Sequence, residues 1–316
     1  MKYFKGQKIN FKNPVVAMGT FDGVHLGHQK LLKKLLEKAE ETGGESVVIS
    51  YYHHPLEVIH KKTFPYLLTE TFYKEDLLKS FGVDHVLYLE FDNKMATMNP
   101  HEFLENIILG EIKAKEMIVG YDTHFGKYRG GDFDFLEKES NHHGYNVELV
   151  EPFKLHNRII SSSLIRDFIR EGDMINATIC LGRNYSINGT VVSGQQIGRG
   201  LGYPTINVFP HEFNKLIPGI GVYICEVKWN DQTFIGTTNI GYSPTLKKNS
   251  FKEIETFILD FSEDLYSQDV EIVFHKKLRD ELDFNSIDEL IKQIENDVRL
   301  TREYFKKNPV NKPTII

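Results

Sequence analysis

Two histidines, His25 and His28, stand at the start of a predicted helix, where they could bind the phosphates of a nucleotide. They close the glycine-rich segment Gly19-Thr20-Phe21-Asp22-Gly23-Val24-His25-Leu26-Gly27-His28, which directly follows an apolar run. Glycines let backbone amides approach phosphate oxygens closely, and imidazoles can donate hydrogen bonds to those oxygens as charge develops on them. An open α/β sheet binds ligands at this place, beyond the carboxyl end of a strand and beside a helix N-terminus. Two histidines alone are more often structural, but this context predicts phosphate chemistry.

The segment Ile160-Ser161-Ser162-Ser163-Leu164-Ile165-Arg166 could take part in the same chemistry. Serines that precede a helix cap it and leave backbone amides available to a ligand. Arg166 follows about one turn later, where a guanidinium could clamp a leaving pyrophosphate. For this segment alone, a plain helix cap with a surface arginine is the better explanation.

Thr205 and Asn207 end a second glycine-dense segment, Gly198-Arg199-Gly200-Leu201-Gly202-Tyr203-Pro204-Thr205-Ile206-Asn207. Two residues apart on a strand, their side chains share one face. Their hydroxyl and amide oxygens are hard ligands that suit Mg²⁺ carrying ATP. A turn followed by a strand with two solvent-facing polar residues explains the segment equally well.

Glu255 lies on a predicted strand and is followed by the apolar residues Phe257-Ile258-Leu259. Burying an unpaired charge is costly, so a carboxylate on a largely buried strand needs a reason. A catalytic base facing an ATP site is one reason, and a structural ion pair is the other. The residues themselves leave both readings open.

Alternating apolar runs and helical patterns in the first half of the chain must position the histidine segment. Leucines at helical spacing predict a helix from about Gly27 to Thr42, which Gly43-Gly44 ends. Strand–helix alternation of this kind predicts an α/β domain, a parallel sheet with helices on both faces. The predicted strands are Val15–Met18, Ser46–Ile49, His85–Leu89, Met117–Val119 and Val147–Val150.

The pattern changes after about residue 183. Two helical stretches, Ser161–Glu171 and Asp173–Leu181, close the first half, and a helix near Ser286–Phe305 ends the second. Between them, many short strands without intervening helices predict a small antiparallel β-barrel. The predicted strands are Ser186–Val192, Thr205–Phe209, Gly221–Val227, Thr233–Ile240, Ile254–Asp260 and Val270–His275. We therefore expect two domains, residues 1–183 and 184–316.

The composition is that of an ordinary globular protein. Of 316 residues, 41% are hydrophobic and 26% charged, and the net charge of −6 argues against a large nucleic-acid-binding surface. Cys180 and Cys225 lie far apart and outside any CxxC pattern, so two reduced, buried thiols are expected rather than a disulfide or a zinc site. The N-terminus lacks a signal-peptide core and no apolar run approaches ~20 residues, so we expect a cytoplasmic protein without a membrane partner. The oligomeric state stays open.

The pattern His25-Leu26-Gly27-His28 resembles the signature of the nucleotidyltransferase superfamily, which moves a nucleotidyl group from a nucleoside triphosphate onto a phosphate. From about residue 14 to 300, the chain resembles the prokaryotic bifunctional riboflavin kinase/FMN adenylyltransferase family. The segment Gly202–Asn207 is similar to the kinase motif Gly-x-Pro-Thr-Ala-Asn of that family. Further landmarks are His54-Pro55, Leu68-Thr69 with Lys74, Gly120-Tyr121-Asp122-Thr123-His124-Phe125-Gly126, Pro218-Gly219-Ile220-Gly221-Val222-Tyr223, Asn239-Ile240-Gly241-Tyr242-Ser243-Pro244-Thr245, Glu255-Thr256-Phe257-Ile258-Leu259-Asp260-Phe261 and Leu278-Arg279-Asp280-Glu281.

The resemblance implies two reactions that consume ATP: phosphorylation of riboflavin to FMN, and adenylylation of FMN to FAD with release of pyrophosphate. It implies a catalytic base, Glu255, for the first reaction and charge stabilisation by His25, His28 and Arg166 for the second. Mg²⁺ would be held through Thr205 and Asn207. The residues expected to bind ATP are Gly19, Phe21, Asp22, Gly23, Ser162, Gly198, Gly202, Thr205 and Asn207. The residues expected on the flavin side are Pro55, Asp122, Phe125 and Arg279.

The chain departs from the family pattern at His53, Thr123, Leu164, Ile206 and Phe257. An enzyme that keeps one of the two activities therefore stays open as an alternative. So does a non-catalytic flavin-binding regulator or RNA-interacting module built on the same fold. The negative net charge and the complete set of predicted catalytic residues argue against the regulator or RNA-interacting module.

Overall fold

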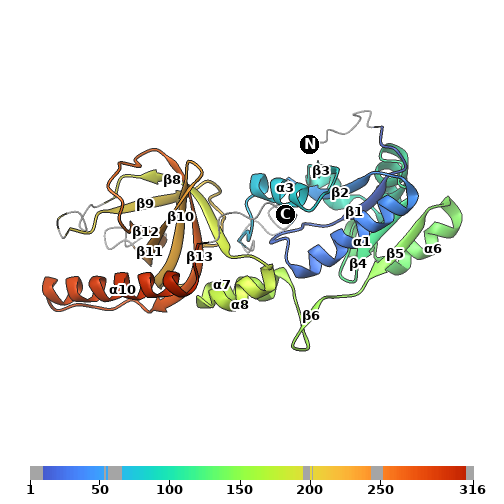
Figure 1. Cartoon of the computed structure of the whole chain (residues 1–316). Helices are drawn as coiled ribbons and strands as arrows, with labels where there is room; N and C mark the ends of the chain where they lie inside the picture. The colour runs from blue at the N-terminus through green and yellow to red at the C-terminus, as the bar shows by residue number, and fades with distance from the viewer. Residues whose placement is uncertain are drawn as a thin grey trace. The chain divides into compact units, whose positions relative to one another are not determined.

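In a computed structural model, the chain divides into two compact units, Met1–Ser162 and Ser163–Ile316 (Figure 1). The structure describes residues 10–52, 55, 66–194, 200, 202–242 and 252–310. The two helices that precede residue 183 belong by their packing to the second unit. The predicted boundary after residue 183 separates the residues expected to carry the two activities, not the two packed units. It stays a prediction.

The first unit is built on a five-stranded parallel sheet with the strand order β3-β2-β1-β4-β5. The central strand consists of Val15, Val16, Ala17 and Met18, and all four side chains are buried. A strand that is apolar at every position suits a parallel sheet covered on both faces. The strands are β1 (Val15–Met18), β2 (Ser46–Tyr51), β3 (His85–Leu89), β4 (Glu116–Gly120) and β5 (Asn146–Val150).

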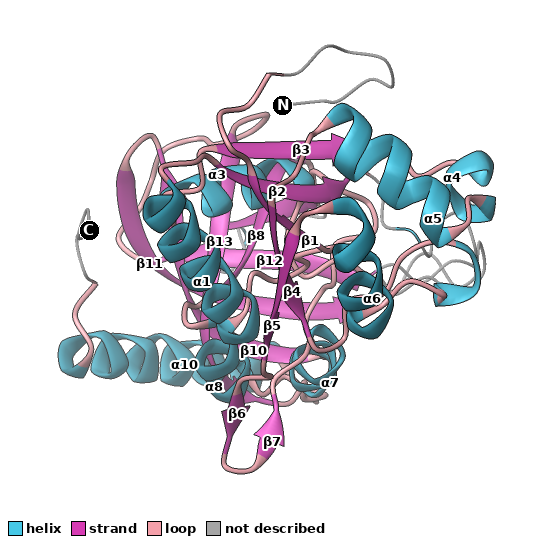
Figure 2. Cartoon of the chain, turned by 90° about the vertical axis from the view of Figure 1, so that its right-hand side faces the viewer, coloured by secondary structure: helices cyan, strands magenta, loops and turns pink. Residues whose placement is uncertain are grey.

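Helices cover both faces of this sheet (Figure 2). The helices α1 (Leu26–Thr42) and α3 (Thr71–Ser80) pack on one face, and the π-helix η1 (Phe103–Glu111) and α6 (Phe133–His143) pack on the other. As predicted, α1 ends at Gly43, whose φ of 59° lies in the left-handed region that terminates helices. The shorter elements are α4 (Asn93–Thr97), α5 (Pro100–Glu102), η2 (Lys127–Arg129), β6 (Lys154–Leu155) and β7 (Arg158–Ile159).

The second unit contains a closed antiparallel barrel with the strand order β10-β11-β12-β9-β8-β13. The helices α7 (Ser162–Glu171) and α8 (Met174–Leu181) precede it, and α8 packs against β8 and β13. The strands are β8 (Tyr185–Val192), β9 (Thr205–Pro210), β10 (Gly221–Trp229), β11 (Gln232–Tyr242), β12 (Lys252–Ile258) and β13 (Asp269–Arg279).

Burial alternates along β12 and separates the two faces of the barrel wall. Ile254, Thr256 and Ile258 are buried in the barrel interior, whereas Glu255 and Phe257 are partly exposed on the outer face. The sequence predicts a carboxylate on a largely buried strand. The structure instead places Glu255 on the outer face, because successive side chains of a strand point to opposite sides.

Helix α10 (Ile287–Lys307) is attached to the barrel by a buried ion pair. Asp297, which is 4% exposed, accepts hydrogen bonds from the Arg279 guanidinium at 2.8–3.2 Å. Gln293 donates a further hydrogen bond to Asp297 at 2.8 Å. On the same helix, the Thr301 hydroxyl lies 3.1 Å from that of Thr237 on β11.

The predicted fold class is confirmed: a parallel α/β sheet with helices on both faces, then a small antiparallel barrel with a terminal helix. Cys180 and Cys225 are buried and form no disulfide, and burial raises the pKa of Cys225 to about 12. No helix in the described part of the chain is long and apolar enough to cross a membrane.

Replacing Asp297 with alanine should lower the free energy of unfolding of the second unit by about 3–5 kcal/mol, because it leaves the largely buried Arg279 without its carboxylate. Urea titration followed by the fluorescence of Trp229, the single tryptophan and a residue of β10, measures this change. Asp260→Ala is the matched control, because it removes an exposed pair with Arg302 and should have little effect. Equal losses in the two variants would show that the buried pair is no anchor.

Candidate functional site

The predicted phosphate-binding loop follows β1 and has an unusual backbone. Gly19 continues the sheet by donating its N–H to the Ile49 carbonyl at 3.0 Å. The chain then adopts positive φ at Phe21 (48°), Gly23 (92°) and Val24 (39°). Left-handed conformations are costly for large and β-branched residues, so the burial of Phe21 and Val24 must hold the loop in this shape.

Both predicted catalytic histidines lie at the N-terminus of α1, where the loop ends. His25 is the N-cap, and its Nδ1 accepts a hydrogen bond from the His28 N–H at 3.3 Å. The two imidazole rings stack with centroids 3.7 Å apart. Because Nδ1 of His25 is the acceptor, the proton of the neutral ring lies on Nε2, which is therefore the hydrogen-bond donor of the ring. A Cβ atom on Gly27 would lie 3.0 Å from the His25 ring, so a small residue is needed there.

Asp22 connects the loop to a distant segment of the first unit. Its carboxylate is 2% exposed and accepts hydrogen bonds from the N–H groups of Leu68 and Thr69 at 2.9–3.1 Å. The Asp22 carbonyl accepts a hydrogen bond from the Ser162 hydroxyl at 2.8 Å. The structure thus brings together two residues, Asp22 and Ser162, that the sequence assigned to ATP.

Lys74, on α3, is a component of this site to which the sequence analysis assigned no role. It is 7% exposed, and its Nζ donates hydrogen bonds to the Thr20 carbonyl at 3.1 Å and to the Ser50 hydroxyl at 3.3 Å. The ammonium also lies 5.4 Å from the centroid of the Tyr88 ring. Lysine is seldom buried, and the sequence signal was its place in a landmark segment of the family.

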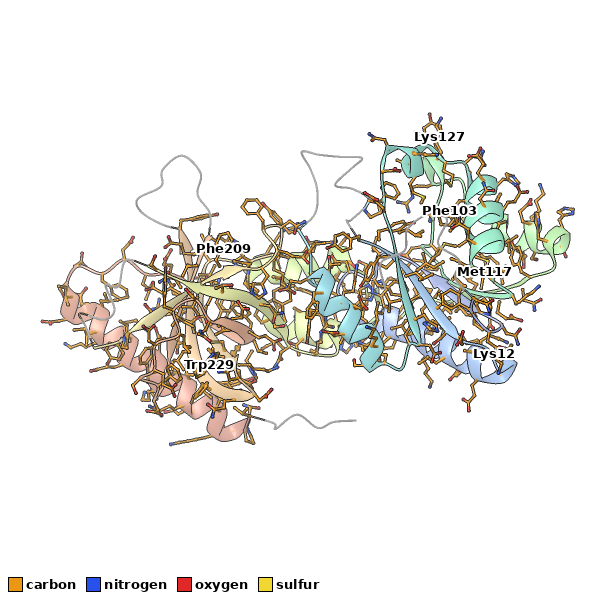
Figure 3. All side chains as sticks on the ribbon, turned by 90° about the horizontal axis from the view of Figure 1, so that it is seen from above. Lys12, Phe103, Met117, Lys127, Phe209 and Trp229 are labelled. Atoms are coloured by element: carbon orange, nitrogen blue, oxygen red, sulfur yellow. The ribbon has the colours of Figure 1, made fainter. Side chains whose placement is uncertain are left out.

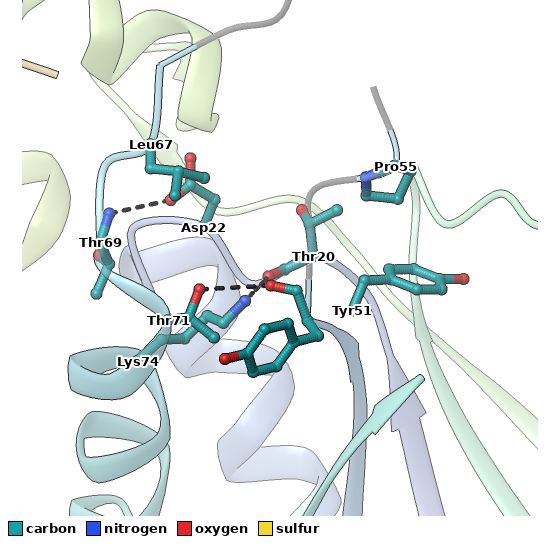
Figure 4. Close-up of a pocket in the computed structure, with 9 residues that line it drawn as sticks. Thr20, Asp22, Tyr51, Pro55, Leu67, Thr69, Thr71 and Lys74 are labelled. Carbon is teal, nitrogen blue, oxygen red and sulfur yellow. Dashed lines mark hydrogen bonds between the residues drawn. The ribbon is translucent and has the colours of Figure 1, made fainter. Parts of the chain in front are cut away.

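A pocket opens beside these contacts (Figure 4). Pro55, which was expected on the flavin side, lines it, whereas His53 and His54 lie outside the described residues. Burial raises the pKa of Tyr51, another lining residue, to about 12. The lining residues are Thr20, Asp22, Tyr51, Tyr52, Pro55, Leu67, Thr69, Thr71 and Lys74.

The other two flavin-side predictions in the first unit lie on the segment after β4. Asp122 is exposed there, whereas the Phe125 ring is 5% exposed. That ring packs against Phe103, labelled in Figure 3, and Phe135, at centroid distances of 5.2 and 5.8 Å. Thr123, which departs from the family pattern, accepts the Gly120 N–H at 2.9 Å and closes the turn.

Arg166 lies on α7 and is buried. Helix geometry places it about one turn after Ser162, as the sequence predicted. Arg166 belongs to the second unit, so its approach to the two histidines stays a prediction.

In the second unit, the predicted metal ligand and the predicted base are in contact. The Thr205 hydroxyl donates a hydrogen bond to Glu255 Oε1 at 2.6 Å. Asn207 pairs with Glu255 across β9 and β12, and Asn239 of β11 pairs with Glu255 on its other side. These four polar side chains therefore lie together on the outer face of the barrel. Within the described residues, Glu255 makes no ion pair, which weighs against a structural ion pair.

The positions of the remaining predicted site residues of the second unit say less about their roles. Gly198 lies outside the described residues, and Gly202 has a φ of 84° with no described atom within 4 Å of its Cβ position. The Arg279 guanidinium is paired with Asp297. The Phe257 ring, at a position of departure from the family pattern, packs edge-on against Tyr203 at 5.3 Å. Among the described residues, no cluster of three or more His, Cys, Asp or Glu could hold a metal ion.

An α/β unit with a histidine-bearing loop, joined in one chain to a barrel with a hydroxyl–carboxylate pair, defines a transferase of two catalytic units. Family comparison agrees: residues 7–164 match the model for FAD synthetase, and residues 181–305 match the model for riboflavin kinase. The chain belongs to the bifunctional riboflavin kinase/FMN adenylyltransferase family.

Relatives that carry this name match nearly the whole chain. The protein of Buchnera aphidicola is 34% identical over 96% of this chain and 98% of its own length. Those of Pseudomonas fluorescens and Escherichia coli K12 are 36% and 34% identical, over 91% and 92% of this chain and 92% of their own lengths. Among solved structures, a Streptococcus pneumoniae protein titled a macrolide-efflux protein has a TM-score of 0.84 at 28% identity, covering 92% of this chain and 94% of its own.

Replacing Asp22 with alanine should expose the N–H groups of Leu68 and Thr69 to exchange and destabilise the first unit by about 1–3 kcal/mol, because two buried donors lose their acceptor. Amide hydrogen exchange reports these two positions directly. The control is Asp132→Ala, which removes the N-cap of α6 in the same unit and should leave both amides protected. Continued protection of Leu68 and Thr69 in Asp22→Ala would contradict the assigned role.

Proposed function

We propose that this chain phosphorylates riboflavin to FMN and adenylylates FMN to FAD, with ATP as the donor in both reactions. The adenylyltransferase is assigned to residues 1–183 and the kinase to residues 184–316. The observation that carries the proposal is the contact of the Thr205 hydroxyl with the Glu255 carboxylate, on the outer face beside Asn207. Cytoplasmic location stays part of the proposal.

In the kinase reaction, the 5′-hydroxyl of riboflavin attacks the γ-phosphorus of ATP, and Glu255 accepts the hydroxyl proton. Thr205 occupies Oε1 of the carboxylate, so Oε2 is the oxygen that takes the proton. A partly exposed position on the outer face gives two substrates access to the carboxylate without opening the barrel core.

The residues around Glu255 fit a magnesium ion. The Thr205 hydroxyl uses its proton on Glu255, which leaves its oxygen lone pairs for a cation. The Asn207 amide oxygen supplies a second hard ligand from the same face. Mg²⁺ bound there with ATP would neutralise phosphate charge during transfer.

In the adenylyl transfer, the FMN phosphate attacks the α-phosphorus of ATP and pyrophosphate leaves. The phosphate is already anionic at neutral pH, so this step needs no general base. His25 and His28 would donate hydrogen bonds to the phosphate oxygens, and Arg166 would bind the leaving pyrophosphate. Stacking of the two rings at the helix N-terminus supports a shared task.

The ATP contacts in the first unit divide into two kinds. Gly19 and Gly23 would bring backbone amides close to phosphates, with Phe21 packed beneath them. Asp22 and Ser162 would act by holding the loop, since the Asp22 carboxylate binds the Leu68 N–H and the Ser162 hydroxyl binds the Asp22 carbonyl. Gly198 and Gly202 would bind the ATP that the kinase reaction consumes.

The flavin-side assignments are proposals of differing kind. Pro55 lines the pocket beside Lys74, and Asp122 is exposed beyond β4, so both can touch a ligand. Phe125 and Arg279 would act indirectly, by holding their own segments in place. The Phe125 ring is buried, and the Arg279 guanidinium is paired with Asp297.

Incubating the purified chain with riboflavin, ATP and Mg²⁺ and separating the products by chromatography tests the proposal. FMN should appear first and FAD should follow. Formation of neither product would refute the function, and formation of one product alone would show a single-activity enzyme.

His28→Ala should lower FAD formation from supplied FMN by about 10²–10³, because a donor to the developing charge is lost. FMN formation should stay near normal, since His28 lies in the first unit. His142→Ala, an exposed histidine on α6, is the matched control and should retain both activities. Equal loss of both activities in His28→Ala would refute the two-site proposal.

Glu255→Gln should lower FMN formation by about 10²–10⁴ without changing the melting curve, because glutamine keeps the size of the side chain but cannot take a proton. Glu253→Gln, an exposed neighbour on β12, should retain activity. A structural role would instead lower the melting temperature and leave turnover in the folded fraction. A stable, fully active Glu255→Gln variant would eliminate both accounts.

A further inference from the structure

Gly194 lies directly against the side chain of Asn207. A Cβ atom on Gly194 would lie 1.9 Å from Asn207 Nδ2, 2.5 Å from Cγ and 3.0 Å from Oδ1. Real Cβ atoms do not approach other atoms this closely, so the carboxamide occupies the space that any side chain at position 194 would need.

The strand order explains this approach. Val192, the last residue of β8, pairs with Asn207 on β9, and Asn207 pairs in turn with Glu255 on β12. Gly194 follows Val192 by two residues, so the chain leaving β8 passes over the outer-face side chain of its partner. The amide nitrogen of Asn207 faces Gly194, and the amide oxygen is farther from it.

The requirement for glycine at this position is steric rather than conformational. Gly194 does not adopt the left-handed backbone that excludes side chains, so alanine could adopt its φ without strain. Gly202 is the opposite case, with a φ of 84° and no atom of the described residues within 4 Å of its Cβ position. Among the described residues, the three atoms nearest to the Cβ position of Gly194 all belong to the Asn207 carboxamide.

We propose that Gly194 is a positioning residue for the kinase reaction, because the absence of a side chain there leaves the Asn207 carboxamide in the position from which its oxygen can ligate the cation. The proposal rests on the assignment of Asn207 to the kinase site. A methyl group at position 194 would turn the carboxamide away, and a flexible side-chain end moves at little cost to stability. Magnesium requires oxygen ligands at about 2.0–2.1 Å in near-octahedral geometry. Turning the Asn207 carboxamide away would therefore remove its oxygen from the coordination shell.

Gly194→Ala in the full chain tests the proposal. FMN formation should fall by about 10²-fold, the usual effect of misplacing a reacting group by about 1 Å, and the Mg²⁺ concentration for half-maximal rate should rise. FAD formation from supplied FMN and the melting temperature should stay unchanged. Ser193→Ala, the exposed preceding residue, is the matched control and should behave as wild type. A full-rate Gly194→Ala, or one that melts several degrees lower, would overturn the proposal.

A double-mutant cycle with Asn207→Ala separates this proposal from the assignment on which it rests. If Gly194 acts through Asn207, adding Gly194→Ala to Asn207→Ala should cost no further activity, because the three atoms nearest to the new methyl group are then gone. Additive losses would show that Gly194 acts on something else and would overturn the positioning role. A fully active Asn207→Ala variant would instead remove Asn207 from the kinase site, and the role of Gly194 with it.

Discussion

The register between β9 and β12 is the constraint on which the candidate kinase site depends. Glu255 stands opposite Asn207, and Phe257 stands opposite Thr205. Side chains alternate between the two faces of a strand, so a slip of β12 by one residue would turn Glu255 and Phe257, the outer set, into the barrel interior. The same slip would turn Ile254 and Ile258, the inner set, outward. Burial of the inner set therefore fixes the positions of the outer set. Closure of the barrel reinforces this register, since β9 and β12 are paired on both edges.

In the first unit, hydrogen bonds rather than strand register hold the candidate site in position. Its loop has a backbone that the chain does not adopt readily, and neighbours on all sides hold it. The Asp22 carboxylate reaches Leu68 and Thr69, and Lys74 reaches Thr20. Both groups are buried, so each contact is stronger than it would be in water. Segments far apart in the sequence thus converge on the loop and support its backbone.

The sequence predicted the strands well because their signal is local. The run Val15–Met18 and the glycine pair after Thr42 mark a strand and a helix end without reference to the rest of the chain. The π-helix Phe103–Glu111 was not foreseen, since its wide turns serve packing against the sheet. The burial of Lys74, the outward position of Glu255 and the pairing of Arg279 with Asp297 were also missed. Each depends on contacts between residues distant in sequence, which periodicity does not report.

The alternation along β12 has a consequence for how this barrel can change over generations. Ile254, Thr256 and Ile258 maintain the interior, while Glu255 and Phe257 occupy the outer surface of the same strand. Substitutions on the outer face need not disturb the packed interior, whereas the interior must stay buried because its burial fixes the strand register. Residues that stabilise the barrel and residues that could take part in the reaction thus alternate along one strand. Such a wall can diversify in substrate while its architecture persists.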